Sequence, residues 1–170
     1  MDIKQIFQKV PPFAGSKGLV FIDDSYVLVF ERDGGTDFYP NHDDLPGGRA
    51  EADETPFETF KRELYEEFGV HVKPNEVVYY STAPDVNIHT KGLDVYFIVA
   101  NLHHDHRKQI KFGKEEGHGY KAIHLDKVLT DTNFIPQYEE FIKEYLQYAE
   151  DHRKPLRNER GHISGHLVLA

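Results

Sequence analysis

Hydrophobic and polar positions form blocks along this chain, and the blocks predict strands and helices in turn. Residues 17–22 and 26–31 are apolar runs joined by turn-forming Asp23-Asp24-Ser25, which predicts a β-hairpin. Residues 33–42 contain two glycines, a proline, an asparagine and two aspartates, and are expected to form a loop. Two further strands, rich in Val and Tyr or Phe, are predicted at 76–82 and 94–101, with a short one at 120–125.

Helical spacing predicts one helix at the C-terminal end of this strand pattern and one in its middle. Residues 136–151 carry an apolar stripe of residues three or four apart: Phe141, Ile142, Tyr145, Leu146, Tyr148 and Ala149. Residues 3–10 also have helical spacing, but the segment is short, two prolines end it, and an irregular lead-in to the first strand is the alternative. Residues 102–117 are polar and basic and are predicted to be a loop. Interleaved strands and helices predict an α/β fold, a mixed sheet with helices packed on its faces.

The middle helix has clear start and stop signals. Thr55 is a suitable N-cap, Pro56 suits the first helical position, and Glu58 completes a capping box with Thr55. Gly69 supplies a C-terminal stop, so the helix is predicted over residues 56–68. Its buried face is formed by apolar residues three or four apart: Phe57, Phe60, Leu64 and Phe68.

The neighbouring face of this helix is acidic. Glu63, Glu66 and Glu67 are three or four residues apart, and like charges at this spacing destabilise a helix by a few tenths of a kcal/mol per pair. They also lie towards the helix C-terminus, where the macrodipole disfavours anions. A bound cation would offset both penalties. The alternative is an ordinary solvated acidic face with Lys61 and Arg62 nearby.

The segment before the helix favours the cation. In Leu45-Pro46-Gly47-Gly48, the two glycines let the backbone approach a ligand closely, and their carbonyls are hard oxygen ligands. Carboxylates combined with carbonyl oxygen suit Mg²⁺ or Mn²⁺ rather than a soft metal. We read this segment as a loop that enters the helix.

Composition narrows the classes of protein. The hydrophobic fraction of 39%, with 12 Phe and 10 Tyr, indicates a folded protein. One domain is expected over residues 1–170, with a core at about 15–151 and short extensions at both ends. No apolar run approaches the ~20 residues that span a bilayer, and the N-terminus does not resemble a signal peptide. A cytoplasmic location fits these properties, and a homodimer is compatible with them.

Charge and cysteine content exclude further classes. The chain has no cysteine, which excludes disulfides, thiolate metal sites and cysteine nucleophiles. The formal net charge of −9 argues against nonspecific nucleic-acid binding, which depends on lysine and arginine. A small anionic ligand still fits such a protein when bound cations reverse the local field.

The segment from Gly48 to Val70 resembles the Nudix box. It reads Gly48, five residues, Glu54, seven residues, Arg62-Glu63-Leu64, Tyr65, Glu66-Glu67, Phe68 and Gly69-Val70, and it agrees at every defining position of that motif over 23 residues. Agreement by chance is on the order of one in a million at ordinary residue frequencies. The order of the strands and the last helix is similar to the family as well.

The resemblance implies a fold, a reaction and a set of residues. Nudix hydrolases have an α/β/α sandwich with a mixed sheet, and they cleave a nucleoside diphosphate linked to a group X with the help of Mg²⁺ or Mn²⁺. Carried onto this chain, the metal ligands would be Glu63, Glu66 and Glu67, with the Gly47 carbonyl as a further candidate. Arg62 would orient a carboxylate through a two-point pair. Glu54 would stabilise the junction of loop and helix, and Gly69 would end the helix.

Other roles remain open between residues. The general base would be Glu63 or Glu67, or a loop glutamate outside the motif, for which Glu115 and Glu116 are the candidates. Arg32, at the end of the second hairpin strand, would reach a substrate phosphate, or it is a surface arginine. Gly48 is expected beside the substrate, where its backbone allows close approach.

The same residues weigh against several rival functions. An isomerase of the isopentenyl diphosphate type relies on a cysteine, which this chain lacks. A messenger-RNA decapping enzyme is disfavoured by the acidic charge. A catalytically silent nucleotide-binding or regulatory module is the main alternative, although the motif is intact. For a hydrolase, the expected partner is a small nucleoside diphosphate derivative: a nucleoside triphosphate, ADP-ribose, a sugar nucleotide or a dinucleoside polyphosphate.

Overall fold

Seven strands form one mixed sheet in the part of the chain that the computed structural model describes, residues 2–35, 37–87, 89–90, 92–102, 104–111 and 119–152. The strands are β1 (Gly15–Ile22), β2 (Tyr26–Glu31), β3 (Asp43–Asp44), β4 (Gly47–Arg49), β5 (Val77–Pro84), β6 (Asp94–Leu102) and β7 (Gly119–His124). The helices are α1 (Pro56–Phe68), α2 (His104–Arg107) and α3 (Pro136–Asp151), with 3₁₀ turns η1 (Ile3–Phe7), η2 (Pro74–Glu76) and η3 (Leu125–Lys127).

The order of the strands places β1 near the centre of the sheet. The main path runs β3-β2-β1-β6-β5, with β4 paired to β1 and β7 paired to β2. β1 and β6 are parallel, from Gly15 opposite Val95 to Ile22 opposite Leu102, whereas β1 and β2 form the predicted antiparallel hairpin. The sheet is therefore mixed, as expected.

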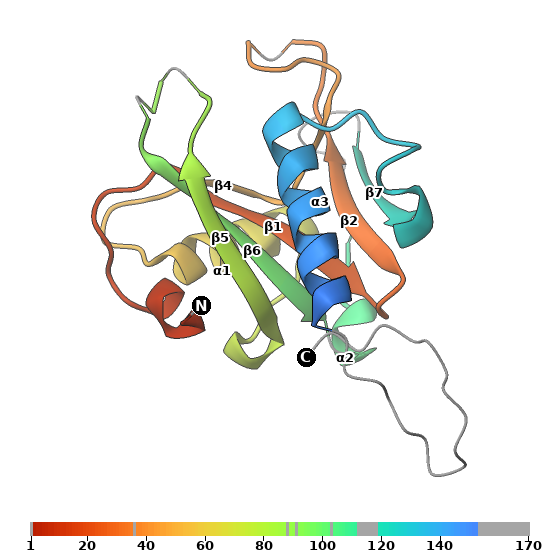
Figure 1. The fold of residues 1–170 in the computed structure, drawn as a ribbon, viewed down its shortest axis with the longest axis horizontal. Coiled ribbons are helices and arrows are strands. Elements are labelled where there is room, and N and C mark those ends of the chain that lie inside the picture. Colours follow the sequence, from red (N-terminus) through yellow and green to blue (C-terminus); the bar gives the residue numbers. More distant parts are fainter. Residues whose placement is uncertain are drawn as a thin grey trace.

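Helices cover both faces of the sheet (Figure 1). Alternating residues of β1 point to opposite sides, so Leu19 and Phe21 pack with α3, whereas Val20 and Ile22 pack with α1 and η1. The apolar faces of both long helices are buried against these strand residues, which accounts for the two layers of core. This arrangement confirms the predicted α/β/α sandwich.

Three segments differ from the sequence-based expectations. The glycine segment is not simply a loop, because Gly47–Arg49 forms strand β4 against β1. The region expected as a loop at 102–117 contains the short helix α2. The N-terminal lead-in is a 3₁₀ turn over Ile3–Phe7. None of the described helices has the length and apolar character needed to cross a membrane.

Candidate active site

Helix α1 is fixed at both ends by the signals predicted for it. The Thr55 side chain accepts from the backbone N–H of Glu58, and the Glu58 carboxylate accepts from the N–H of Thr55. Gly69 adopts a left-handed conformation with φ of 71°, and its N–H donates to the Tyr65 carbonyl at 2.8 Å. The helix therefore begins at Pro56 and ends at Phe68, as predicted, and includes all three glutamates of the acidic face.

Close packing on β1 sets the position of α1 over the sheet. A Cβ built on Gly18 would lie 2.1 Å from Cε2 of Phe60, so the phenyl ring rests directly on the strand backbone. Ser16, also on β1, donates its hydroxyl to the Pro56 carbonyl at 2.8 Å. These contacts bring the acidic face of α1 to the edge of β4.

The glycines of β4 allow the carboxylates of α1 to approach the backbone. Gly47 has φ of 127°, and a Cβ there would lie 2.1 Å from the Ser16 carbonyl oxygen. A Cβ on Gly48 would lie 2.4 Å from Oε1 of Glu63. Gly47 therefore requires glycine for its backbone conformation, whereas at Gly48 the absence of a side chain leaves space that the Glu63 carboxylate occupies.

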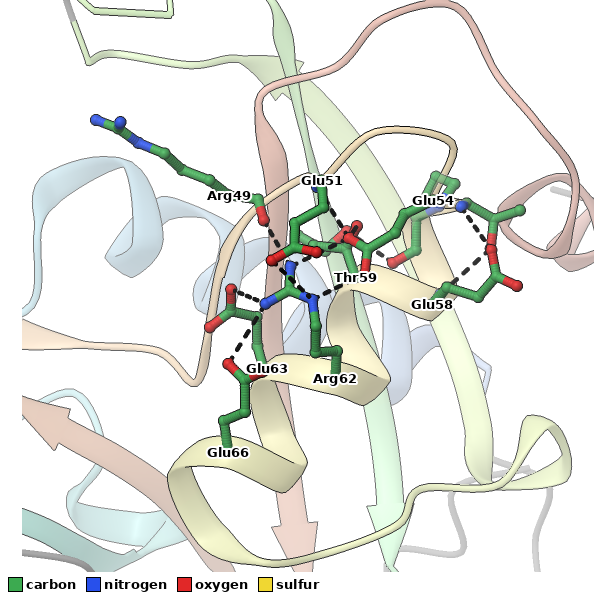
Figure 2. A network of polar contacts seen from close by, with 11 residues as sticks. Arg49, Glu51, Glu54, Glu58, Thr59, Arg62, Glu63 and Glu66 are labelled. Carbon is green, nitrogen blue, oxygen red and sulfur yellow. Dashed lines mark hydrogen bonds and ion pairs between the residues drawn. The ribbon is translucent and has the colours of Figure 1, made fainter.

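Arg62 lies at the centre of a polar network that joins α1 to the preceding segment (Figure 2). Its Nε and Nη2 donate to the two carboxylate oxygens of Glu54, at 2.8 and 3.1 Å. Nη2 also donates to the Arg49 carbonyl at 2.9 Å, and Nη1 donates to Glu63 Oε1 at 2.7 Å. Glu66 lies farther away, with Oε2 at 3.4 Å from Nη1. The guanidinium thus holds Glu63 in a defined orientation.

Glu54 is surrounded by donors. Besides Arg62, the Thr59 hydroxyl donates to it at 2.8 Å and the Glu51 backbone N–H at 3.0 Å. The hydrogen bonds from Arg62 lower the pKa of Glu54 to about 2, although burial acts in the opposite direction. With both oxygens engaged in this way, Glu54 is placed to support the junction of β4 and α1.

Glu67, on the same acidic face, contacts the backbone of β4 and not Arg62. Its Oε2 accepts from the Gly47 backbone N–H at 2.9 Å. Burial raises the pKa of Glu67 to about 8, against the opposing attraction of Lys17 and the hydrogen bond from Gly47. This carboxylate is therefore short of positive charge, a condition that a nearby divalent cation would relieve.

The three predicted metal ligands share one helix face but are engaged separately. Glu63 is paired to Arg62, Glu67 to the Gly47 N–H, and the Glu66 side chain is 56% exposed. Among the described residues, no group of three or more histidine, aspartate and glutamate side chains is gathered closely enough to hold a metal ion. The hard oxygen donors suit Mg²⁺ or Mn²⁺, but they would have to move towards one another to share an ion.

A cavity of about 280 Å³ lies beside Glu67. Its wall is built from the two glycines of β4, from β1 and β2, and from residues around β3, β5 and α3. The charged residues that line it are Lys17, Arg32, Asp44, Arg49, Glu67 and Asp85. The predicted site residues Gly47, Gly48, Arg32 and Glu67 are thus brought to one cavity.

Four of the charged lining residues, Lys17, Asp44, Arg49 and Asp85, were absent from the predicted site, and Lys17 and Asp44 contact each other. Asp44 is only 1% exposed, and it pairs with Lys17 Nζ at 2.9 Å and with Arg32 Nη1 at 2.8 Å. The sequence signals of Lys17 and Asp44 were a lysine at the start of an apolar run and an aspartate directly before Leu-Pro-Gly-Gly. Lys17 Nζ also donates to the Gly47 carbonyl at 2.8 Å. The backbone oxygen predicted as a metal ligand therefore accepts from a lysine.

Arg32 lies at the cavity but its donors are partly used. Nη1 is bound to Asp44, Nε donates to the Phe38 carbonyl at 3.0 Å, and the guanidinium lies 5.8 Å from the centre of the Phe38 ring. The side chain is well anchored at the cavity wall. Glu115 and Glu116, the loop candidates for a general base, lie outside the described residues.

Comparison with solved structures finds the same fold in several proteins. A MutT protein from Methanosarcina mazei Go1 is 20% identical, with 86% of this chain and 100% of that chain covered and a TM-score of 0.61. A MutT protein from Bacillus halodurans is 24% identical over 78% and 80% of the two chains, with a TM-score of 0.55. The NUDIX domain of Shewanella oneidensis NrtR, solved with ADP ribose, is 17% identical over 82% and 90%, with a TM-score of 0.60.

These likenesses concern the fold, because the identities are low. A comparison with curated proteins finds no significant match. The family model described as the NUDIX domain matches residues 14–145, which includes β1, the glycine segment, all of α1 and most of α3. With the complete motif on α1 and the sandwich fold around it, this match shows that the chain belongs to the Nudix family.

Proposed function

We propose that this protein is a hydrolase that uses a divalent cation to cleave the diphosphate linkage of a nucleoside diphosphate joined to a group X. One observation carries the proposal: the half-buried Glu67 carboxylate lies on Gly47 at the wall of a cavity that also presents Lys17 and Arg32. Acidic groups on one side and basic groups on the other are what a metal–diphosphate complex needs. The family membership and the intact motif support the same reading.

The residues of this chain would have separate tasks. Glu63, Glu66 and Glu67 would hold Mg²⁺ or Mn²⁺, which when bound neutralises phosphate oxygens and activates water. Arg62, itself held by Glu54, would keep the Glu63 carboxylate in place. The positioning matters because a misplacement of about 1 Å can cost a factor of 10² in rate.

The cationic side of the cavity would bind the substrate. Arg32 is anchored by Asp44 and by Phe38, so its guanidinium is presented at a fixed place for a phosphate oxygen. Gly48 also lines this cavity, and the absence of a side chain there lets the Glu63 carboxylate lie against the cavity wall. Glu63 or Glu67 would take the proton from water, with Glu115 and Glu116 as the alternative bases. The net charge of −9 favours a small molecule over a nucleic acid as substrate.

A catalytically silent nucleotide-binding module is the second candidate. It is favoured by the separate engagement of the three motif glutamates and by the lysine on the Gly47 carbonyl. The NUDIX domain of Shewanella NrtR was solved with ADP ribose, so a domain of this fold can hold such a ligand. The two candidates differ in turnover: a silent module would bind a nucleotide and release no product.

The deciding experiment is a substrate panel with Mg²⁺ or Mn²⁺. Nucleoside triphosphates, ADP-ribose, sugar nucleotides and dinucleoside polyphosphates are incubated with the protein, and released phosphate or nucleotide is measured. We expect turnover of at least one class, and a loss of about 10²-fold or more in kcat for Glu66→Gln and Glu67→Gln. Glu140→Gln, on the exposed surface of α3, is the matched control for loss of a negative charge.

Two results would contradict the proposal. Full activity in both motif variants would show that the site is elsewhere. Saturable nucleotide binding with no product from any class would favour the silent module.

A further inference from the structure

Lys17 is an unusual residue for the centre of a sheet. It lies on β1 directly opposite Gly47 of β4, and its side chain is 14% exposed. An ammonium group has three N–H donors. Here Nζ lies 2.9 Å from Asp44 Oδ1, 2.8 Å from the Gly47 carbonyl and 3.2 Å from the Leu45 carbonyl. The ammonium therefore donates to the two carbonyls and forms an ion pair with the Asp44 carboxylate.

This arrangement resembles the oxygen shell of a bound cation. A carboxylate and two backbone carbonyls converge on one positive group, and the same kinds of ligand bind hard metal ions. Two independent features keep the ammonium in place. Asp44 is almost fully buried and needs positive neighbours, and the pairing of β1 with β4 fixes the distance from Lys17 to the carbonyls.

The charge state of Lys17 agrees with this geometry. Burial by itself would lower the pKa of Lys17, but the attraction of Asp44, with smaller contributions from Tyr138 and Glu67, raises it above its ordinary value. The lysine is therefore positively charged at neutral pH. Glu67 lies on the same side of the cavity, next to Gly47.

We infer that the Lys17 ammonium takes the place of a metal ion at the Gly47 carbonyl, so that this chain binds its divalent cation through the α1 carboxylates alone. The Gly47 oxygen and Asp44 are then withheld from the metal. Lys17 is a positioning residue that supplies fixed positive charge on the β1 side of the cavity, where it faces the substrate phosphates.

The inference rests on the proposed function, because it concerns which oxygen groups of the proposed metal site bind the ion and which bind Lys17. It reverses one of the sequence-based predictions, namely the Gly47 carbonyl as a metal ligand. It also gives Asp44 a role: the carboxylate holds both Lys17 and Arg32, the two cations of the cavity.

The test is a titration with Mn²⁺, followed by the electron paramagnetic resonance signal of the free ion, in the absence of substrate. The matched pair is Asp44→Asn and Lys17→Met/Asp44→Asn, which differ only at Lys17 and leave no unpaired buried carboxylate at position 44. We expect the double variant to bind an additional Mn²⁺ ion, or to bind Mn²⁺ about tenfold more tightly, because the Gly47 and Leu45 carbonyls become free.

Two further variants separate charge from folding. Lys17→Met keeps Asp44 and should show the larger gain in Mn²⁺ binding, provided that circular dichroism shows a folded protein. Lys17→Arg keeps the positive charge, and its Mn²⁺ binding should equal that of the wild type. A merely structural role of Lys17 would alter the melting temperature in these variants without changing the number of bound ions.

The outcomes distinguish this inference from the proposed function. Equal Mn²⁺ number and affinity in the matched pair would overturn the role of Lys17. Loss of Mn²⁺ binding when Glu67→Gln is added to either member of the matched pair would support the carboxylate site, independently of the role of Lys17. Binding of Mn²⁺ only after Lys17 is removed would overturn the inference, which has the wild-type chain bind its cation through the α1 carboxylates, and would also contradict a metal-dependent wild-type enzyme. No binding in any variant would overturn both.

Discussion

At the scale of single residues, Arg62 shows how this site limits the freedom of a charged side chain. Its guanidinium contacts both oxygens of Glu54, the Arg49 carbonyl and Glu63. Arginine presents its donors in a rigid planar fork, so contacts on several sides fix both its position and its tilt. A lysine at the same place would form a single-point contact and leave Glu63 without this orientation.

The Glu54–Arg62 pair predicts a pH-dependent stability difference. Because Arg62 lowers the pKa of Glu54 from 4.5 to about 2, the carboxylate stabilises the folded state above pH ~4.5, and this contribution is lost as the pH falls through about 2. For Glu54→Gln we expect a free energy of unfolding lower by about 2 kcal/mol at pH 7, with the difference shrinking towards zero near pH 2. Urea unfolding at several pH values measures this.

The control for that prediction is Glu51→Gln. Glu51 lies beside Glu54, but its carboxylate is 70% exposed and 3.9 Å from Arg62 Nε. Its loss should change stability little at any pH. A Glu54→Gln deficit that stayed constant from pH 7 to pH 2 would show that the carboxylate charge is not the cause.

At the scale of elements, glycines decide how closely α1 and the sheet approach. Phe60 lies on Gly18 of β1, and the Glu63 carboxylate lies on Gly48 of β4. The first contact is apolar and supports the core, whereas the second is polar and belongs to the site. A side chain that lies directly on a glycine therefore stabilises the core at Gly18 and positions a carboxylate of the candidate site at Gly48.

The contact at Gly48 predicts a loss of activity without loss of fold. In Gly48→Ala the new methyl group would lie 2.4 Å from Glu63 Oε1, so the flexible carboxylate must move away. Since Gly48 is not in a left-handed conformation, the backbone tolerates alanine, and we expect a change in melting temperature equivalent to less than about 1 kcal/mol. We expect kcat to fall by about 10²-fold because Glu63 is displaced.

Gly35→Ala is a suitable control for Gly48→Ala, because Gly35 lies in the loop between β2 and β3, away from Glu63. Both kcat and the melting temperature should match those of the wild type. If Gly48→Ala were as active as this control, the placement of Glu63 against β4 would have no catalytic importance.

The elements also differ in how far the sequence predicts them. The bounds of α1 and α3 agree with the structure to the residue, because the capping residues and the proline starts are local signals. Strand β4 was not predicted, since three residues with two glycines carry no alternation of polar and apolar positions. Helix α2 is a single turn in a polar segment, and that length is too short for a periodic pattern.

At the scale of the whole molecule, the sheet brings together residues that are distant along the chain. The faces of β1 contribute to two separate cores, one under α1 and one under α3. The motif residues were predictable because most of them lie on one helix. Lys17 and Asp44 meet only through the pairing of β1 with β4 and of β2 with β3, so no local pattern marks them as neighbours.

The clustered charges predict that divalent cations stabilise the folded protein. Glu63, Glu66 and Glu67 repel one another on one helix face, and an ion shared between them binds the folded state in preference to the unfolded chain. Free Mg²⁺ or Mn²⁺ at ten times its Kd would add about 1.4 kcal/mol, a rise of roughly 3–6 °C in melting temperature for a domain of this size. Calorimetry with and without a chelator measures the shift. Metal should raise the melting temperature of Glu67→Gln by less than that of the wild type, whereas Glu140→Gln should show the wild-type rise. A melting temperature indifferent to millimolar metal would mean that folding does not prepare the carboxylates to bind an ion.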